Sequence, residues 1–66
     1  MNTLLSFGHG YSARALGRRL LARGWRVIGT TRGPEKAAEL AAEGVEPLIW
    51  PGEGLEQALG AATHLL

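Results

Sequence analysis

Residues 4–13 read LLSFGHGYSA, an apolar run that ends in a glycine turn. From Gly8 onward the spacing is GxGxxA, a variant of the fingerprint with which one fold class binds dinucleotides. In that fingerprint the first glycine permits a tight strand-to-helix turn, the second lets the backbone approach a pyrophosphate, and a small third residue lets the helix pack close to the strand. The helix that follows points its free N–H groups at the phosphates. We therefore expect the whole turn to bind the cofactor: Gly8, His9, Gly10, Tyr11, Ser12 and Ala13.

The length and composition of the chain limit what it can be. Its 66 residues allow at most one small domain, and a chain of this size buries only about 60% of the surface that it exposes when unfolded. There is no cysteine, so no disulfide and no thiolate metal site is expected. No stretch approaches the ~18 consecutive apolar residues of a membrane span, and the N-terminus lacks the features of a signal peptide. These features predict a soluble, cytoplasmic domain without membrane contact.

The net charge of +1 hides an uneven distribution. The first 33 residues carry six arginines and no acid, whereas the remaining residues carry one lysine and six glutamates. An arginine-rich half beside a phosphate-binding turn favours an anionic ligand. Four of these arginines fall on the outer face of one predicted helix, where a solvated surface is the simpler interpretation: Arg14, Arg18, Arg19 and Arg23. No aromatic residues interleave with the arginines, so nucleic acid is not expected as a partner.

Apolar periodicity predicts the elements on either side of the glycine turn. Residues 3–7 form a nearly continuous apolar run, as in a parallel strand covered on both faces. From Ala13 onward the apolar positions follow a helical period. Ser12 is the expected N-cap of this helix, and Gly24 is its expected C-terminal stop.

The chain continues to alternate between strands and helices. Residues 26–31, with the sequence RVIGTT, predict a second strand. A helix follows between Pro34, which suits a first helical position, and Gly44. Residues 45–50 predict a third strand, and because Pro47 lies inside it, this strand should lie at an edge of the sheet.

A short helix over residues 55–59 and a short strand over residues 63–66 complete a β-α-β-α-β-α-β order. This order predicts an α/β fold with a three-layer, Rossmann-like parallel sheet of strand order 3-2-1-4, the N-terminal half of a doubly wound fold. Residues 1–66 would then form an NAD(P)-binding Rossmann segment, expected to be the N-terminal fragment of a larger protein. The fourth strand would leave an apolar, unpaired edge, which predicts either a homo-oligomer joined there or a C-terminal portion that covers it.

The end of the second strand decides which dinucleotide fits. In a Rossmann unit an acidic residue at this position accepts hydrogen bonds from the 2′-hydroxyl of the adenosine ribose. About 20 residues after the glycines, this chain has Thr30, Thr31 and Arg32 instead. A carboxylate would repel a 2′-phosphate, whereas arginine can pair with it in a bidentate manner. The sequence therefore favours NADP over NAD as the cofactor, and a solvated turn residue is the alternative interpretation of Arg32.

A longer stretch, GHGYSARALGRRLLARGWRVIGTTRGPEKAAEL at residues 8–40, resembles the amino-terminal segment of a known group. The group is the atypical and extended short-chain dehydrogenase/reductases, which are NAD(P)-dependent and epimerase/dehydratase-like. The resemblance covers residues 3–50 best, and the glycine spacing is closer to that of some atypical bacterial members than to the GxxGxxG of extended members. It implies a cofactor-binding segment of an oxidoreductase or epimerase/dehydratase. An aspartate after the third strand often touches the adenine in this group, and residues 51–54 hold none here.

The same resemblance implies catalysis by a tyrosine with a lysine four residues later. Tyr11 is the only tyrosine and has no lysine at that spacing, so no catalytic residue is assigned. Ser12 has no base placed for it, and His64 has no metal-ligating neighbour in the sequence. His9 is interpreted either as a neighbour of the pyrophosphate or as a loop filler, and Trp50 as a packing residue.

Three functions remain open from the sequence. The first is the cofactor-binding segment of an NADP-dependent oxidoreductase or epimerase, with this chain alone inactive because it lacks the catalytic pair. The second is a non-catalytic regulatory domain that senses NADP. The third is an inactive structural fragment. The first two share a small-molecule dinucleotide as partner, and the fold alone does not separate them.

Overall fold

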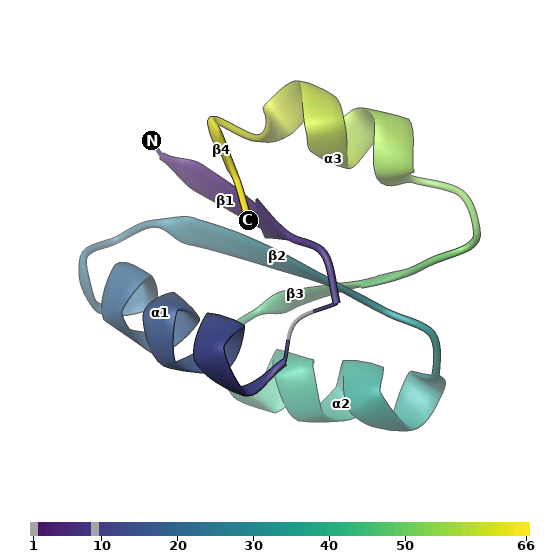
Figure 1. The fold of residues 1–66 in the computed structure, drawn as a ribbon, viewed down its shortest axis with the longest axis horizontal. Coiled ribbons are helices and arrows are strands. Elements are labelled where there is room, and N and C mark those ends of the chain that lie inside the picture. The colour runs from purple at the N-terminus through teal and green to yellow at the C-terminus, as the bar shows by residue number, and fades with distance from the viewer. Residues whose placement is uncertain (1, 9) are drawn as a thin grey trace.

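Strands and helices alternate along the part of the chain that the structure describes (Figure 1). The structure is a computed structural model, and it describes residues 2–8 and 10–66. In chain order the elements are β1 (Thr3–Ser6), α1 (Tyr11–Ala22), β2 (Arg26–Thr31), α2 (Pro34–Ala42), β3 (Glu46–Ile49), α3 (Leu55–Ala61) and β4 (His64–Leu65). The strands are all parallel and follow the order β3-β2-β1-β4. This topology confirms the predicted Rossmann-like α/β fold.

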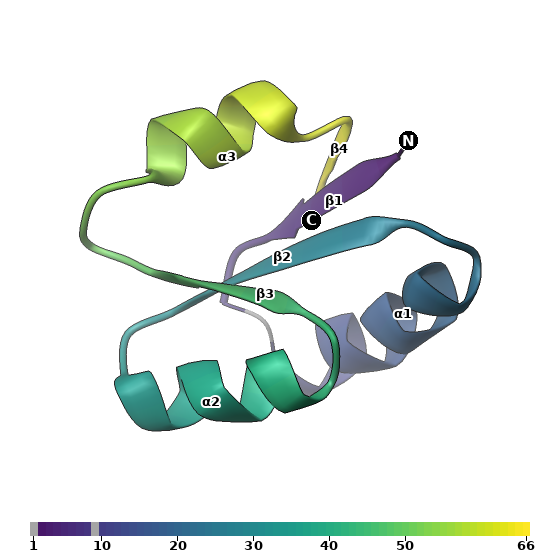
Figure 2. The ribbon, with the colours of Figure 1, turned by 180° about the vertical axis from the view of Figure 1, so that it is seen from behind.

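The helices lie on both faces of the sheet and so make three layers. α1 and α2 cover one face, and α3 covers the other (Figure 1 and, from behind, Figure 2). Successive side chains of a strand point to opposite faces, so Leu4 packs in one apolar cluster and Leu5 in the other. The buried partners are Val27, Leu40 and Val45 in the first cluster, and Ile28 and Ala58 in the second. All of β1 is buried, as expected for a parallel strand that is covered on both sides.

The turn between β1 and α1 differs from the prediction in one respect. α1 begins at Tyr11, and its N-cap is Gly10, whose carbonyl oxygen accepts a hydrogen bond from the N–H of Arg14 at 2.9 Å. The predicted N-cap role of Ser12 is therefore wrong, because this residue already lies inside the first turn and the helix has no side-chain cap. The reason is the shortness of the turn, which starts the helix soon after the bend at Gly8.

The other element ends lie close to their predicted positions. β1 stops at Ser6 and not at residue 7, and α3 continues to Ala61 and does not end at residue 59. β3 lies at one edge of the sheet, which confirms the position inferred from Pro47. None of the described helices is long and apolar enough to cross a membrane.

β4 forms the opposite edge of the sheet and is short. Its pairing with β1 continues through Leu66, whose N–H donates to Leu5 O at 3.0 Å and whose carbonyl oxygen accepts from Phe7 N–H at 3.2 Å. Leu65 and Leu66 remain 61% and 55% exposed. The last described residues thus extend the sheet but bury little apolar surface.

Two ion pairs tie neighbouring elements together. Arg14 on α1 binds Glu43 at the end of α2. Arg26 binds Glu46 through hydrogen bonds of 2.5 and 2.8 Å, which link the starts of β2 and β3. The hydrogen bond from the Arg26 guanidinium lowers the pKa of the Glu46 carboxyl below its ordinary value. The solvated-face interpretation is wrong for Arg14, because the end of α2 approaches α1 there.

Candidate functional site

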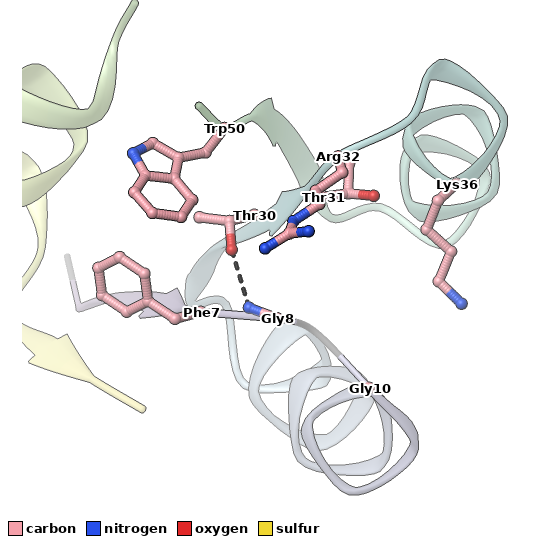
Figure 3. Close-up of a pocket in the computed structure, with 8 residues that line it drawn as sticks. All are labelled: Phe7, Gly8, Gly10, Thr30, Thr31, Arg32, Lys36 and Trp50. Atoms are coloured by element: carbon pink, nitrogen blue, oxygen red, sulfur yellow. Dashed lines mark hydrogen bonds between the residues drawn. The ribbon is translucent and has the colours of Figure 1, made fainter. Parts of the chain in front are cut away.

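A pocket of about 440 Å³ lies at the carboxyl ends of β1, β2 and β3 (Figure 3). Its volume falls within the range of small-molecule sites, and carboxyl ends of parallel strands are where ligands bind in open α/β sheets. The pocket is lined by Phe7, Gly8, Gly10, Thr30, Thr31, Arg32, Lys36 and Trp50. These residues come from the glycine turn, the end of β2, the first turn of α2 and the end of β3.

Gly8 bends the chain out of β1. Its φ is 62°, in the left-handed region that glycine adopts without steric cost. A Cβ at Gly8 would meet no described residue within 4 Å apart from its chain neighbours, so the described structure requires glycine here for its backbone conformation. The N–H of Gly8 donates to Thr30 Oγ1 at 2.8 Å, which ties the turn to the end of β2.

Gly10 is a different case. Its φ of −87° and ψ of −162° are extended backbone that other residues also adopt. A Cβ at Gly10 would lie 3.6 Å from the Gly8 carbonyl oxygen, an ordinary van der Waals distance. Neither the backbone angles nor packing against the described residues therefore requires a glycine at this position. The space that its missing side chain leaves is at the N-terminus of α1, where free N–H groups favour an anion.

The end of β2 supplies three polar residues with different surroundings. Thr30 is 6% exposed and its hydroxyl accepts the bond from Gly8. Thr31 is half-buried, and Arg32 is exposed. Arg32 has no ion-pair partner among the described residues. The guanidinium is thus available to a ligand in the pocket.

Lys36 is a second cation at the pocket, and sequence reasoning missed it. It lies in the first turn of α2, and its nearest acid is Glu39, one helical turn on, at 3.7 Å. Its position in the sequence could have indicated this role. Lys36 follows Arg32 by four residues, and the helix that begins at Pro34 places it in the first turn after the end of β2. No acidic residue is among the described residues that line the pocket, so its charge is positive.

Two aromatic side chains also line the pocket, and the sequence did not predict this role. Alternation along the strands places Phe7, Thr30 and Trp50 on the α3 side of the sheet, in line with the buried Leu5 and with Ile28 and Leu48 of the neighbouring strands. The close-up shows the two rings on the same side of the pocket (Figure 3). Trp50 is 42% exposed and Phe7 is 45% exposed. The interpretation of Trp50 as a packing residue is therefore wrong. β3 ends at Ile49, and Trp50 follows it at the edge of the pocket and not in the apolar core.

The remaining predicted site residues lie beside the pocket or outside the described part of the chain. Ala13 is 9% exposed, which fits a small residue that lets α1 pack close to the sheet. Ser12 is exposed on the first turn of α1. Tyr11 is the first residue of that helix, and the structure describes its backbone only. His9 lies outside the described residues.

The described residues include no group of histidine and acidic side chains placed to hold a metal ion. His64, the described histidine, accompanies β4 and contacts Trp25, with their ring centroids 4.9 Å apart. What converges on the pocket is a glycine turn, two cations, two threonines and two aromatic rings.

Comparison with known proteins supports the fold. The sequence matches no protein-family profile and no curated protein. Among the solved structures that match, the following two each align with 98% of the chain. A functionally unknown conserved protein from Silicibacter pomeroyi DSS is 54% identical, with a TM-score of 0.85. A candidate NAD-dependent epimerase/dehydratase from Bacillus halodurans is 22% identical, with a TM-score of 0.76.

The chain spans 22% of the first of these proteins and 32% of the second. It therefore has the Rossmann-like fold seen in the epimerase/dehydratase from Bacillus halodurans, over a part of that protein's length.

Proposed function

We propose that this chain binds a nicotinamide dinucleotide in the pocket at the ends of β1, β2 and β3. One observation carries the proposal: Gly10, at the N-terminus of α1, has no side chain, although its backbone angles and its described neighbours would allow one. A pyrophosphate fits such a place because its charge meets the free N–H groups of the helix and its bulk needs a residue without a side chain. Gly8 and Gly10 would hold the pyrophosphate, and Thr31 and Arg32 would face the adenosine.

The charges of the pocket favour NADP over NAD. The acid that accepts the ribose 2′-hydroxyl in NAD-binding Rossmann units is absent, and Arg32 stands in that region without an ion-pair partner among the described residues. Lys36 adds a second cation nearby. A 2′-phosphate would gain charge-assisted hydrogen bonds from these groups, and NAD has no phosphate there to use them.

We further propose that this site is the cofactor-binding segment of a larger NAD(P)-dependent oxidoreductase or epimerase/dehydratase of the atypical or extended short-chain dehydrogenase/reductase type. The resemblance of residues 8–40 and the fold shared with the epimerase/dehydratase from Bacillus halodurans support this proposal. The pocket residues bind and orient, and the described residues do not place a proton donor or base against a substrate. Chemistry at the nicotinamide would therefore depend on groups other than the described side chains of the pocket.

Direct titration tests the cofactor and its preference together. We would titrate NADP⁺ and NAD⁺ into the purified chain, into Arg32→Ala and into Arg18→Ala, and follow the fluorescence of Trp50, which lines the pocket. Arg18 is the matched control because it is an exposed arginine on the outer face of α1. Loss of a hydrogen bond between charged groups costs about 1.5–3 kcal/mol, so Arg32→Ala should weaken NADP⁺ binding about tenfold to hundredfold.

The affinity for NAD⁺ should change little in Arg32→Ala. The affinities for both cofactors should be unchanged in Arg18→Ala. Equal affinities of the unmodified chain for NADP⁺ and NAD⁺ would refute the assignment of Arg32. Absence of binding for both cofactors would refute the dinucleotide site itself.

A further inference from the structure

One threonine hydroxyl joins two of the three strand ends that form the pocket. The N–H of Gly8, just after β1, donates a hydrogen bond to Thr30 Oγ1 on β2 at 2.8 Å, drawn as a dashed line in Figure 3. The two residues are 22 positions apart in the sequence. Thr30 is 6% exposed, so water competes little for this bond.

The bond restrains Gly8, whose backbone has the greater conformational freedom of a glycine. Gly8 has a φ of 62°, and a glycine reaches other backbone regions at similar energy. Apart from its chain neighbours, no described residue packs against this position, since a Cβ at Gly8 would find none of their atoms within 4 Å. A hydrogen bond to the backbone N–H is therefore the described contact that selects one conformation of the turn.

Thr30 is well placed to supply that restraint. It lies in the ladder between β2 and β3, where it pairs with Leu48, and it directly follows Gly29, which pairs with Ser6 of β1. Threonine is branched at Cβ, which limits its side chain to few rotamers. The hydroxyl consequently presents its oxygen to Gly8 from a rigid support.

We infer that Thr30 is a positioning residue for the turn from Gly8 to Gly10, and that it acts on binding through the turn and not through the adenosine. This inference rests on the proposed dinucleotide function. It separates two roles at the end of one strand: Arg32 discriminates between NADP and NAD, whereas Thr30 supports the pyrophosphate site that both cofactors share. Loss of the Thr30 hydroxyl should then weaken both cofactors by the same factor.

The experiment compares three variants. Thr30→Val keeps the shape of the side chain and removes the hydroxyl, and Thr30→Ser restores the hydroxyl. Thr63→Val is the matched control, because Thr63 Oγ1 accepts a backbone hydrogen bond from Thr3 N–H at the same 2.8 Å, away from the pocket lining. Each variant is titrated with NADP⁺ and NAD⁺, and amide hydrogen exchange at Gly8 is measured by NMR in the chain without cofactor.

A neutral hydrogen bond contributes about 0.5–1.5 kcal/mol, which corresponds to a loss of about threefold to tenfold in affinity. We expect that loss for both cofactors in Thr30→Val, recovery in Thr30→Ser, and no change in Thr63→Val. Exchange at Gly8 should accelerate in Thr30→Val only.

Three results would overturn the inference: unchanged affinity in Thr30→Val, a loss confined to NADP⁺, or the same loss in Thr63→Val. If the unmodified chain bound neither cofactor, the proposed function would fail, and Gly8 exchange would decide the positioning role alone. If Thr30→Val did not fold, unprotected exchange at Gly8 in the unmodified chain would overturn the inference, and protected exchange there would support it.

Discussion

Replacing Gly10 with serine should make the chain more stable and abolish binding of the dinucleotide. Gly10 is the N-cap of α1, has extended backbone angles, and makes no side-chain capping bond. Serine is among the best N-cap residues because its hydroxyl oxygen accepts a hydrogen bond from an N–H of the first turn. Space for its Cβ exists, since the nearest atom would be the Gly8 carbonyl oxygen at 3.6 Å.

The expected gain in stability follows from two small terms. Serine exceeds glycine as an N-cap by a few tenths of a kcal/mol. Removing a glycine also reduces the conformational entropy of the unfolded chain, which stabilises a compatible site by about 0.4–1 kcal/mol. The sum is about 0.7–1.3 kcal/mol, which raises the melting temperature of a domain of this size by roughly 3–10 °C.

Binding should change in the opposite direction. The serine side chain would occupy the space into which we place the pyrophosphate, and its oxygen would take the N–H groups that the phosphate needs. Gly8→Ala is the companion variant: with a φ of 62° at Gly8, an added Cβ costs roughly 1–2 kcal/mol of stability, although it meets no neighbour.

Thermal unfolding followed by circular dichroism gives the stability of each variant, and titration with NADP⁺ gives the affinity. Binding by Gly10→Ser at the affinity of the unmodified chain would refute the placement of the pyrophosphate. We conclude that the fold itself does not require a glycine at position 10. If Gly10→Ser lost as much stability as Gly8→Ala, this conclusion would be refuted.

Three further predictions concern stability and assembly. Ser6→Ala should raise the melting temperature in a thermal scan, because the buried Ser6 hydroxyl has no hydrogen-bond partner among the described residues and alanine removes the cost of its burial; a lower melting temperature would reveal a bond. The Arg26 hydrogen bond lowers the pKa of Glu46, so the pair stabilises the fold fully above the ordinary value of 4.5 and loses its effect as the pH falls through the lower folded-state value. Glu46→Gln should therefore flatten the acid side of a plot of melting temperature against pH, and an unchanged slope would show that the exposed pair contributes nothing. The purified chain should self-associate in sedimentation experiments through β4, where Leu65 is 61% exposed, and Leu65→Lys should restore a monomer; a monomeric unmodified chain would contradict this.

The order of the elements could be predicted because each leaves a local signature. The continuous apolar run of β1 and the helical period from Ala13 are properties of short windows, and glycines mark where one period gives way to the other. The position of β3 at the edge followed from Pro47 alone, because a proline lacks the N–H that an interior strand uses on both sides. Physical rules that act within ten residues thus specify most of this fold.

The start of α1 could not be predicted as well. Serine is the better N-cap by intrinsic preference, which pointed to Ser12. The structure begins the helix directly after Gly10, because the chain has only a short turn in which to pass from the end of β1 to the face of the sheet. The short connection between β1 and α1 thus outweighed the preference of Ser12 for the N-cap position.

The contents of the pocket also depend on relations between distant segments. Trp50 looks like a core residue in the sequence, yet it follows the last residue of β3 and lies beside Phe7 only because β1, β2 and β3 end at the same edge. The bond between Gly8 and Thr30 is equally invisible to local patterns, since nothing in a threonine on an apolar strand indicates its partner. Such contacts follow from the register of the sheet, which the sequence did not define.

The position of the pocket within the sheet indicates which parts of the proposed dinucleotide it would hold. In the order β3-β2-β1-β4 the direction of winding reverses between β1 and β4, and ligands of open α/β sheets bind across that reversal point. The pocket lies on the β2 and β3 side, where the cations Arg32 and Lys36 stand. Beyond β1 the described residues end with the exposed, apolar Leu65 and Leu66. A dinucleotide held by its pyrophosphate over Gly10 would therefore have its phosphates and adenosine bound by this chain. Its nicotinamide would lie toward β4, on the side of the exposed Leu65 and Leu66.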